Sequence, residues 1–215
     1  MLQRAEPTPQ LKEWIDRLAP VVAEAKGTLR HRQPGKLIML TGCEQDADGD
    51  FRLRFFWQEY IISAEDFTVR RAKDEEVPSS FVQSLILTYL ATADGTTPSS
   101  RWIGFRELPD GMFYAQAFRG YTGIRLVREL TGGIDAFRRA AERMESEPLE
   151  AIGDAGYAFT LLPRVHVAVV YWRGDEDFPS QARVLFEDTA AHYMPTDGLA
   201  IMGSHLVGSL LRAAE

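Results

Sequence analysis

The sequence predicts an α+β protein, a single domain with a largely antiparallel sheet and helices packed on it. Strand-like runs rich in β-branched and aromatic residues follow one another across short turns, which is typical of antiparallel pairing. Helical patterns stand between sets of strands instead of after every strand, so a doubly wound parallel sheet is disfavoured. We expect an N-terminal helix and linker over residues 1–35 and one α+β domain over residues 36–215.

Composition limits the function classes that fit this chain of 215 residues. The formal net charge of −7 disfavours binding along a nucleic-acid backbone. The single cysteine, Cys43, excludes an internal disulfide and a zinc or iron–sulfur site built from cysteines alone. No run approaches the ~18 apolar residues of a membrane span, and the N-terminus lacks the apolar core of a secretion signal. We therefore expect a soluble, cytoplasmic protein without nucleic-acid or membrane partners.

The first third of the chain predicts one helix followed by several strands. Thr8 caps the helix, Pro20 kinks it or ends its regular part, and Gly27 ends it. Its apolar stripe recurs at helical spacing. The members of this stripe are Leu11, Trp14, Ile15, Leu18, Val22 and Ala25.

Beyond the linker, short runs of apolar residues separated by polar turns predict strands. Residues 36–41 form a short strand, residues 51–63 hold two, and residues 67–71 add another. A helix over residues 80–93 then begins at a cap formed by Ser79 or Ser80.

The middle of the chain predicts a hairpin and then a broken helix. Residues 101–108 and 112–119 are strand-like and flank the turn sequence Pro109-Asp110-Gly111. Residues 121–144 return to helical spacing, interrupted at Thr131-Gly132-Gly133.

The last third contains the longest apolar run, residues 165–172, which predicts a buried central strand. A charged loop over residues 173–179 joins it to a second strand over residues 182–186. A final helix begins at a cap formed by Thr196 or Asp197.

Two blocks of sequence resemble one known family. The first is the pattern LPRVxVxVxYWxGDEDFPxxAxVLFEDxAxxYxPTD from Leu162, and the second is YLATADGTTPSSRWIGFRELPDGMFYAQAF from Tyr89. Together they resemble an uncharacterised prokaryotic family catalogued as domain of unknown function 3786. The resemblance implies a neighbourhood of iron–sulfur domains of the corrinoid-protein kind, and hence of redox, one-carbon or tetrapyrrole metabolism. His166 stands where this family pattern has proline or an apolar residue, so the resemblance gives it no role.

A ligand site is predicted where the hairpin around Pro109-Asp110-Gly111 meets the loop after the central strand. Its members are Trp102, Arg106, Arg119 and Trp172. Tryptophan rings offer stacking area, and arginine is the side chain best shaped to bind a carboxylate or phosphate. An anionic small molecule or a tetrapyrrole suits such a set, whereas no particular cofactor is identified.

A second candidate is the acidic loop Asp175-Glu176-Asp177, with Asp188 as a fourth carboxylate. Carboxylates beside a strand end can bind hard cations or act as general bases. Adjacent side chains in an extended chain point apart, so a turn whose acids cap backbone amides is the preferred interpretation. No metal site is predicted. His166, on the central strand, is interpreted as a hydrogen-bonded core or edge histidine.

The sequence therefore favours a small-molecule or cofactor binding protein associated with redox or one-carbon metabolism. Two alternatives stay open. One is an interaction module that docks on an iron–sulfur or methyl-transfer partner, and the other is a metal-dependent hydrolase or lyase that uses residues 175–177. The sequence leaves open whether the protein is an enzyme, because it holds no complete catalytic motif.

Overall fold

The protein was analysed as a computed structural model that describes residues 9–215. It has helices and two sheets with antiparallel pairing throughout, which confirms the predicted α+β class. The described chain divides into two compact units between Gly95 and Thr96, and not at the expected linker near residue 35. Two compact units can belong to one domain, so the single domain over residues 36–215 stays a prediction. The expected cap Thr8 lies outside the described residues.

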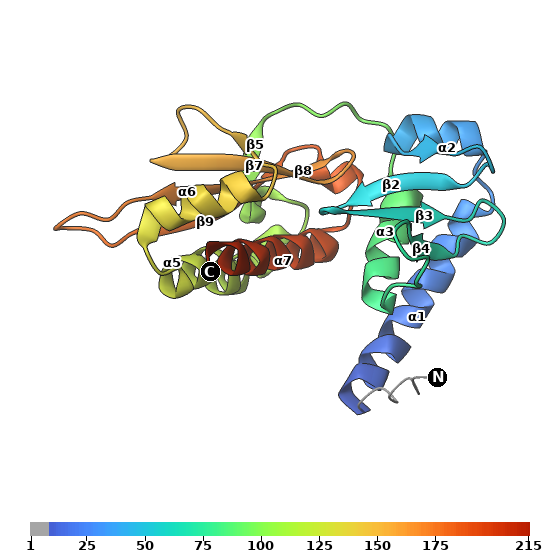
Figure 1. Ribbon diagram of the computed structural model, residues 1–215, viewed down its shortest axis with the longest axis horizontal. Coiled ribbons are helices and arrows are strands. Elements are labelled where there is room, and N and C mark those ends of the chain that lie inside the picture. The colour runs from blue at the N-terminus through green and yellow to red at the C-terminus, as the bar shows by residue number, and fades with distance from the viewer. Residues whose placement is uncertain (1–8) are drawn as a thin grey trace. The chain divides into compact units, whose positions relative to one another are not determined.

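The first unit combines three helices with a four-stranded sheet of order β1-β2-β3-β4 (Figure 1). Its elements are α1 (Pro9–Leu29), α2 (Pro34–Thr41), β1 (Glu44–Gln45), β2 (Phe51–Phe55), β3 (Gln58–Ile62), β4 (Val69–Arg71) and α3 (Ser80–Thr92). In β2 every second residue is buried, namely Phe51, Leu53 and Phe55. This alternation confirms the strands predicted within residues 51–63, and β4 confirms the one predicted within residues 67–71.

Two predictions for the first unit are wrong. Residues 36–41 lie in helix α2 instead of a strand, because Pro34 opens the helix and Gly42, at φ 69°, ends it in the left-handed conformation. The Gly42 amide donates to the Ile38 carbonyl over 2.8 Å, which closes the last turn. Helix α1 also runs past Gly27 to Leu29.

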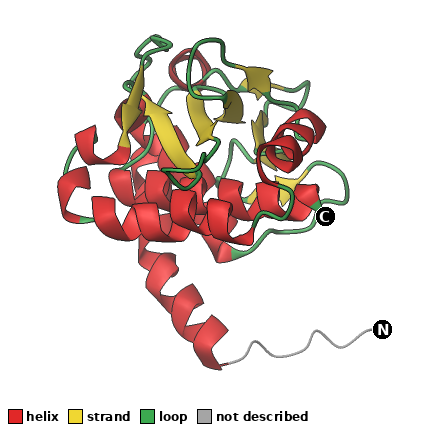
Figure 2. Ribbon diagram, turned by 90° about the vertical axis from the view of Figure 1, so that its left-hand side faces the viewer, coloured by secondary structure: helices red, strands yellow, loops and turns green. Residues whose placement is uncertain are grey.

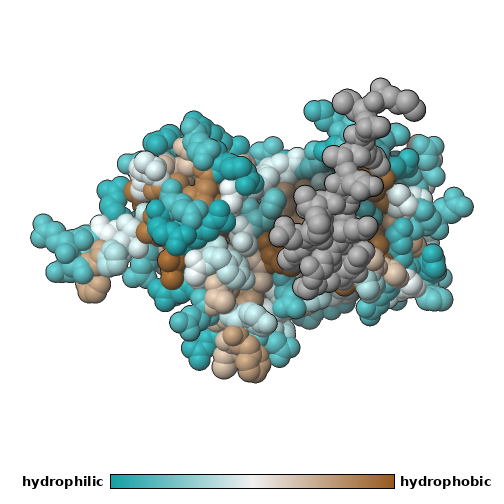
Figure 3. All heavy atoms as spheres, turned by 90° about the horizontal axis from the view of Figure 1, so that it is seen from below, coloured by the Kyte–Doolittle hydropathy of each residue, from teal (hydrophilic) through white to brown (hydrophobic). Residues whose placement is uncertain are grey.

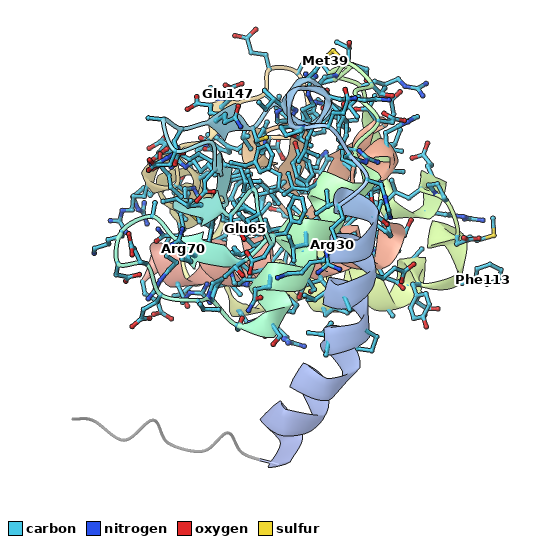
Figure 4. All side chains as sticks on the ribbon, turned by 90° about the vertical axis from the view of Figure 1, so that its right-hand side faces the viewer. Arg30, Met39, Glu65, Arg70, Phe113 and Glu147 are labelled. Carbon is cyan, nitrogen blue, oxygen red and sulfur yellow. The ribbon has the colours of Figure 1, made fainter. Side chains whose placement is uncertain are left out.

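Arg32 caps the C-terminal end of α3. Its guanidinium donates to the carbonyl oxygens of Ala91 over 2.5 Å and of Ala93 over 2.8 Å. Replacing Arg32 by methionine keeps the apolar stem and removes both charged hydrogen bonds, so we expect a loss of about 1.5–3 kcal/mol in unfolding free energy. Urea denaturation measures this loss. Arg30→Met is the control, because the exposed Arg30 side chain points outward in Figure 4, and a loss of equal size there would contradict the prediction.

Cys43 lies in the core of the first unit and is 3% exposed. The Thr41 hydroxyl lies 3.0 Å from its sulfur, and the Tyr89 hydroxyl donates to the Thr41 carbonyl. Burial raises the pKa of the Cys43 thiol above its ordinary value. The cysteine is therefore a neutral, packed side chain in the folded protein.

The second unit is built on a five-stranded sheet of order β5-β9-β8-β7-β6. Its strands are β5 (Trp102–Gly104), β6 (Glu147–Pro148), β7 (Ala155–Leu162), β8 (Val165–Trp172) and β9 (Gln181–Glu187). Its helices are α4 (Ala115–Arg119), the π-helical turn η3 (Gly120–Ile124), α5 (Arg125–Glu129), α6 (Gly133–Arg143) and α7 (Thr196–Ala214). Three further single turns are η1 (Phe105–Glu107), η2 (Gly111–Phe113) and η4 (Ala190–His192).

The helices of the second unit gather on one face of its sheet, below the strands in Figures 1 and 2. Phe137 of α6 packs against Tyr157 of β7 and Tyr171 of β8, with ring centroids 5.6 and 5.7 Å apart. Val167 and Val169 of β8 are 0% exposed, which confirms the buried central strand. A side chain at Gly203 of α7 would meet the rings of Phe118 and Phe186, so this helix lies close to β9.

Several secondary-structure predictions for the second unit are wrong or incomplete. Residues 112–119 are not a strand, so the predicted hairpin around Pro109-Asp110-Gly111 is wrong, although the chain does turn there. Asp110 adopts a left-handed conformation, with φ 57°, and the chain then enters η2 and α4. Strand β7 was not predicted at all. The final helix is present, but it begins at Thr196 with Pro195 at the cap position, so the predicted cap at Thr196 or Asp197 is wrong.

No helix within residues 9–215 has both the length and the apolar character needed to cross a bilayer.

Candidate functional site

A pocket of about 500 Å³ lies in the second unit, beside the edge of β9 where β5 ends. Strand β5 pairs with only Leu185, Phe186 and Glu187 of β9. The helical segment of α4 and η3 lies along the remaining edge, and both sides contribute to the lining. We call this cavity the arginine pocket; its lining includes Trp102, Phe105, Arg106, Phe118, Arg119 and Arg183.

Three of the four residues predicted for the ligand site line this pocket. Trp102 comes from β5, Arg106 from η1 and Arg119 from the end of α4. Trp172 is not among the lining residues, but the Arg183 guanidinium carbon lies 5.6 Å from the centroid of its ring. The binding role of these residues stays a prediction, and Arg106 reaches the pocket from a helical turn and not from the strand expected of it.

Arg183 was not among the predicted site residues. Trp172 pairs with Gln181 across the β8–β9 ladder, so Arg183 is its diagonal neighbour on the same face of the sheet. The register of the hairpin that joins residues 172 and 181 could have revealed this residue.

The arginine pocket carries an excess of positive charge. Within the described residues, the side chains of Arg106 and Arg119 make no hydrogen bond or ion pair, and the Arg183 guanidinium has a cation–π contact with the Trp172 ring but no hydrogen bond or ion pair. Glu107 is the acidic lining residue, and its carboxylate already accepts a hydrogen bond of 2.7 Å from the Gly104 amide. Guanidinium groups without partners on one cavity can bind a carboxylate or a phosphate, in the bidentate geometry that arginine favours.

Aromatic rings form the inner wall of this pocket. Phe105 and Phe118 stack with centroids 4.2 Å apart and an angle of 15° between their planes. Gly123 lies at the floor, where the helical segment approaches β9 closely. A β-carbon built on Gly123 would lie 2.0 Å from the Ala182 carbonyl oxygen. An apolar wall facing a few cationic groups is the usual make-up of a small-molecule site.

A second cluster holds Trp102 in place from the end of β9. Glu187 is 2% exposed, and its carboxylate accepts from the Ser100 amide and lies 2.8 Å from His166 Nδ1. His166 is thus hydrogen-bonded, as the sequence analysis proposed for it. Glu187 was missed, and it is the buried acid that fixes the strand start before Trp102.

Asp188 binds the neighbouring segment before β5. It pairs with Arg101 over 2.7 Å and accepts from the Ser99 hydroxyl. These hydrogen bonds, first from Ser99 and then from Arg101, hold its pKa below the ordinary value. Asp188 is therefore not grouped with the acidic loop.

The acidic loop has the geometry of a capped turn. One oxygen of the Asp175 carboxylate accepts from the amides of Asp177 and Phe178, over 2.9 and 2.8 Å. Among the described residues, no group of three or more histidine, cysteine, aspartate or glutamate side chains could hold a metal ion. No contact in this loop supports the hydrolase alternative.

Fold and site together define a small α+β protein with an arginine-lined pocket at a sheet edge. A family model described as domain of unknown function (DUF3786) matches residues 33–209. The chain therefore belongs to this family, which confirms the resemblance seen in its sequence. No curated protein and no solved structure matches the chain.

Proposed function

We propose that this protein binds a small anionic molecule in the arginine pocket. The observation that carries the proposal is that Arg106, Arg119 and Arg183 lie on one cavity without a carboxylate partner. The protein as a whole is acidic, with a net charge of −7, so the overall composition does not account for arginines without partners on one cavity. A bound anion would pair with these arginines through charged hydrogen bonds.

Tetrapyrroles belong to the class of ligands that this pocket suits. Their carboxylate side chains match the arginines, and their planar ring matches Trp102 and the Phe105–Phe118 wall. The particular link to tetrapyrroles, and to redox or one-carbon metabolism, rests on the family resemblance alone.

The test is a titration followed by tryptophan fluorescence, because Trp102 lines the pocket and Trp172 lies against Arg183. The probes are a porphyrin with propionate groups and phenyl phosphate. We expect the double variant Arg106→Ala with Arg119→Ala to raise the dissociation constant of either bound probe at least about ten-fold, equivalent to ~1.4 kcal/mol. Added salt should weaken binding as well, since these arginines are exposed.

Arg139→Ala is the matched control. Arg139 is an exposed arginine of α6 and lies outside the pocket lining. If a probe binds and the double variant keeps its affinity, the site lies elsewhere. If neither probe binds at micromolar concentration, the proposal is wrong.

One observation favours the interaction module as the second candidate. Met112, Phe113 and Tyr114 are 64%, 85% and 62% exposed, although consecutive large apolar side chains are usually covered. Figure 4 shows Phe113 pointing away from the chain. The partner class, an iron–sulfur or corrinoid protein, again comes from the resemblance. Weaker binding of such a partner to Phe113→Ser, measured by surface plasmon resonance, would support this candidate.

A further inference from the structure

A second pocket, of about 410 Å³, adjoins the arginine pocket. Arg119, Gly123 and Ala182 line both cavities. We call the second cavity the apolar pocket, because Ile124, Val127 and Pro179 form its apolar lining.

Both pockets lie between the same two segments of the chain. Along β9 and the loop before it, the arginine pocket uses residues 182–185 and the apolar pocket uses residues 179–182. Along the helical segment, the first uses residues 115–123 and the second uses residues 119–128. The two cavities therefore form one groove, with Gly123 at its floor and Arg119 where they meet.

The two ends of this groove differ in chemistry. The arginine pocket presents guanidinium groups without partners, as described above. In the apolar pocket, Arg128 already has a carboxylate partner, because it donates to Glu129 over 2.6 Å. The remaining surface includes Ile124, which is 49% exposed. A ligand that covers Ile124 would remove apolar surface from water.

The apolar character continues beyond the groove. Phe178 precedes Pro179 in the loop between β8 and β9 and is 67% exposed. Figure 3 shows the arm that this loop forms, on its left, as mostly hydrophilic with one small hydrophobic group near its tip.

We propose that the ligand is a soluble amphipathic anion with a single linear chain. Its carboxylate or phosphate head binds Arg106 and Arg119, and its apolar chain lies along Ile124, Val127 and Pro179. This inference rests on the proposed function and narrows its ligand class. A rigid planar macrocycle would occupy the arginine pocket and leave the apolar pocket empty, whereas a chain-bearing anion fills both.

The test is isothermal titration of the whole protein with straight-chain carboxylates from butyrate to decanoate, each kept monomeric. Burial of each added methylene should lower the dissociation constant by about two- to four-fold, until the chain outgrows the groove. Alkylamines of the same lengths should not bind, because their charge opposes that of the arginines.

A pair of variants locates the chain. Ile124→Asn should lower the ratio of decanoate affinity to butyrate affinity by at least about four-fold, since it replaces apolar surface by an amide. Met112→Asn is the control, because Met112 is also exposed but lines neither pocket, and the ratio should stay as in the original protein.

The outcomes separate the two proposals. If butyrate and phenyl phosphate bind through Arg106 and Arg119 but chain length has no effect, the amphipathic ligand is wrong and the anion site stands. If no anion of any length binds, both proposals are wrong. If phosphatidylglycerol vesicles bind the protein while decanoate does not, the anion that the groove binds belongs to a membrane surface. The proposal of a soluble ligand is then wrong.

Discussion

Replacing Val169 by aspartate is expected to abolish folding of residues 96–215. Val169 is 0% exposed on the central strand β8, where it pairs with Tyr157 of β7 and Val184 of β9. An ionised carboxylate there would have no partner, and burying it costs several kcal/mol. A domain has only about 5–15 kcal/mol of unfolding free energy in total. Circular dichroism should show the loss of a cooperative thermal transition for this unit.

Thr160→Asp is the control for this substitution. Thr160 lies on the neighbouring strand β7, but its side chain is exposed, so the new charge stays in water. This variant should keep its thermal transition within a few degrees of the original. A soluble Val169→Asp protein that unfolds as cooperatively as the control would show that β8 is not the buried centre of the sheet.

The second large effect is expected at Gly123, the floor of the groove. A β-carbon at this position would lie 2.0 Å from the Ala182 carbonyl oxygen and 2.9 Å from its carbon. Both are backbone atoms, so the helical segment or β9 must move. Overpacking of this kind costs about 1–3 kcal/mol, so Gly123→Ala should lower the melting temperature by roughly 2–12 °C. Because Gly123 lines both pockets, ligand affinity should fall as well.

Gly120 offers a matched control in the same π-helical turn. Nothing lies within 4 Å of a β-carbon built there, and its backbone is already helical, with φ −61°. Gly120→Ala should be neutral or stabilise the protein by up to about 1 kcal/mol, because it restricts the unfolded chain. Equal melting temperatures for the two alanine variants would contradict the close approach of η3 to β9.

The sequence predicted strands and helices correctly where one clear feature, such as a long apolar run or a helix cap, decided the secondary structure. Residues 165–172 could be assigned because seven of these eight residues, all but His166, are apolar, which fits a strand covered on both faces. Helix α3 could be assigned because Ser79 caps it, accepting from the Val82 amide, before an apolar run.

The failures have two other causes: a cap and a turn outweigh side-chain preference in one segment, and tertiary packing does so in the other. The apolar residues 37–40 favoured a strand, but Pro34 and the left-handed Gly42 define a helix of eight residues. Residues 112–119 favoured a strand because Phe113, Tyr114 and Phe118 have high strand propensity. In the fold, stacking of Phe118 on Phe105 is compatible with a helix, and tertiary packing decided the outcome.

The candidate site residues were chosen by side-chain chemistry, and their binding role stays a prediction. Trp102, Arg106 and Arg119 line one pocket, although the hairpin used to bring them together does not exist. Glu187 could not be found from its chemistry, because an isolated glutamate at a strand end resembles any surface acid. Only the fold shows that it is buried and holds the segment before Trp102.

The burial of Cys43 gives the protein a built-in reporter for its first unit. A packed thiol with a raised pKa reacts slowly with alkylating agents, and the chain has no second cysteine to compete. Modification therefore requires this region to open, so the labelling rate in increasing denaturant follows the unfolding of the first unit alone. Trp102 and Trp172 belong to the second unit, and replacing Trp14 and Trp57 by phenylalanine leaves a fluorescence signal from that unit alone. Comparing the two signals measures whether residues 9–95 and 96–215 unfold as one cooperative body or as two.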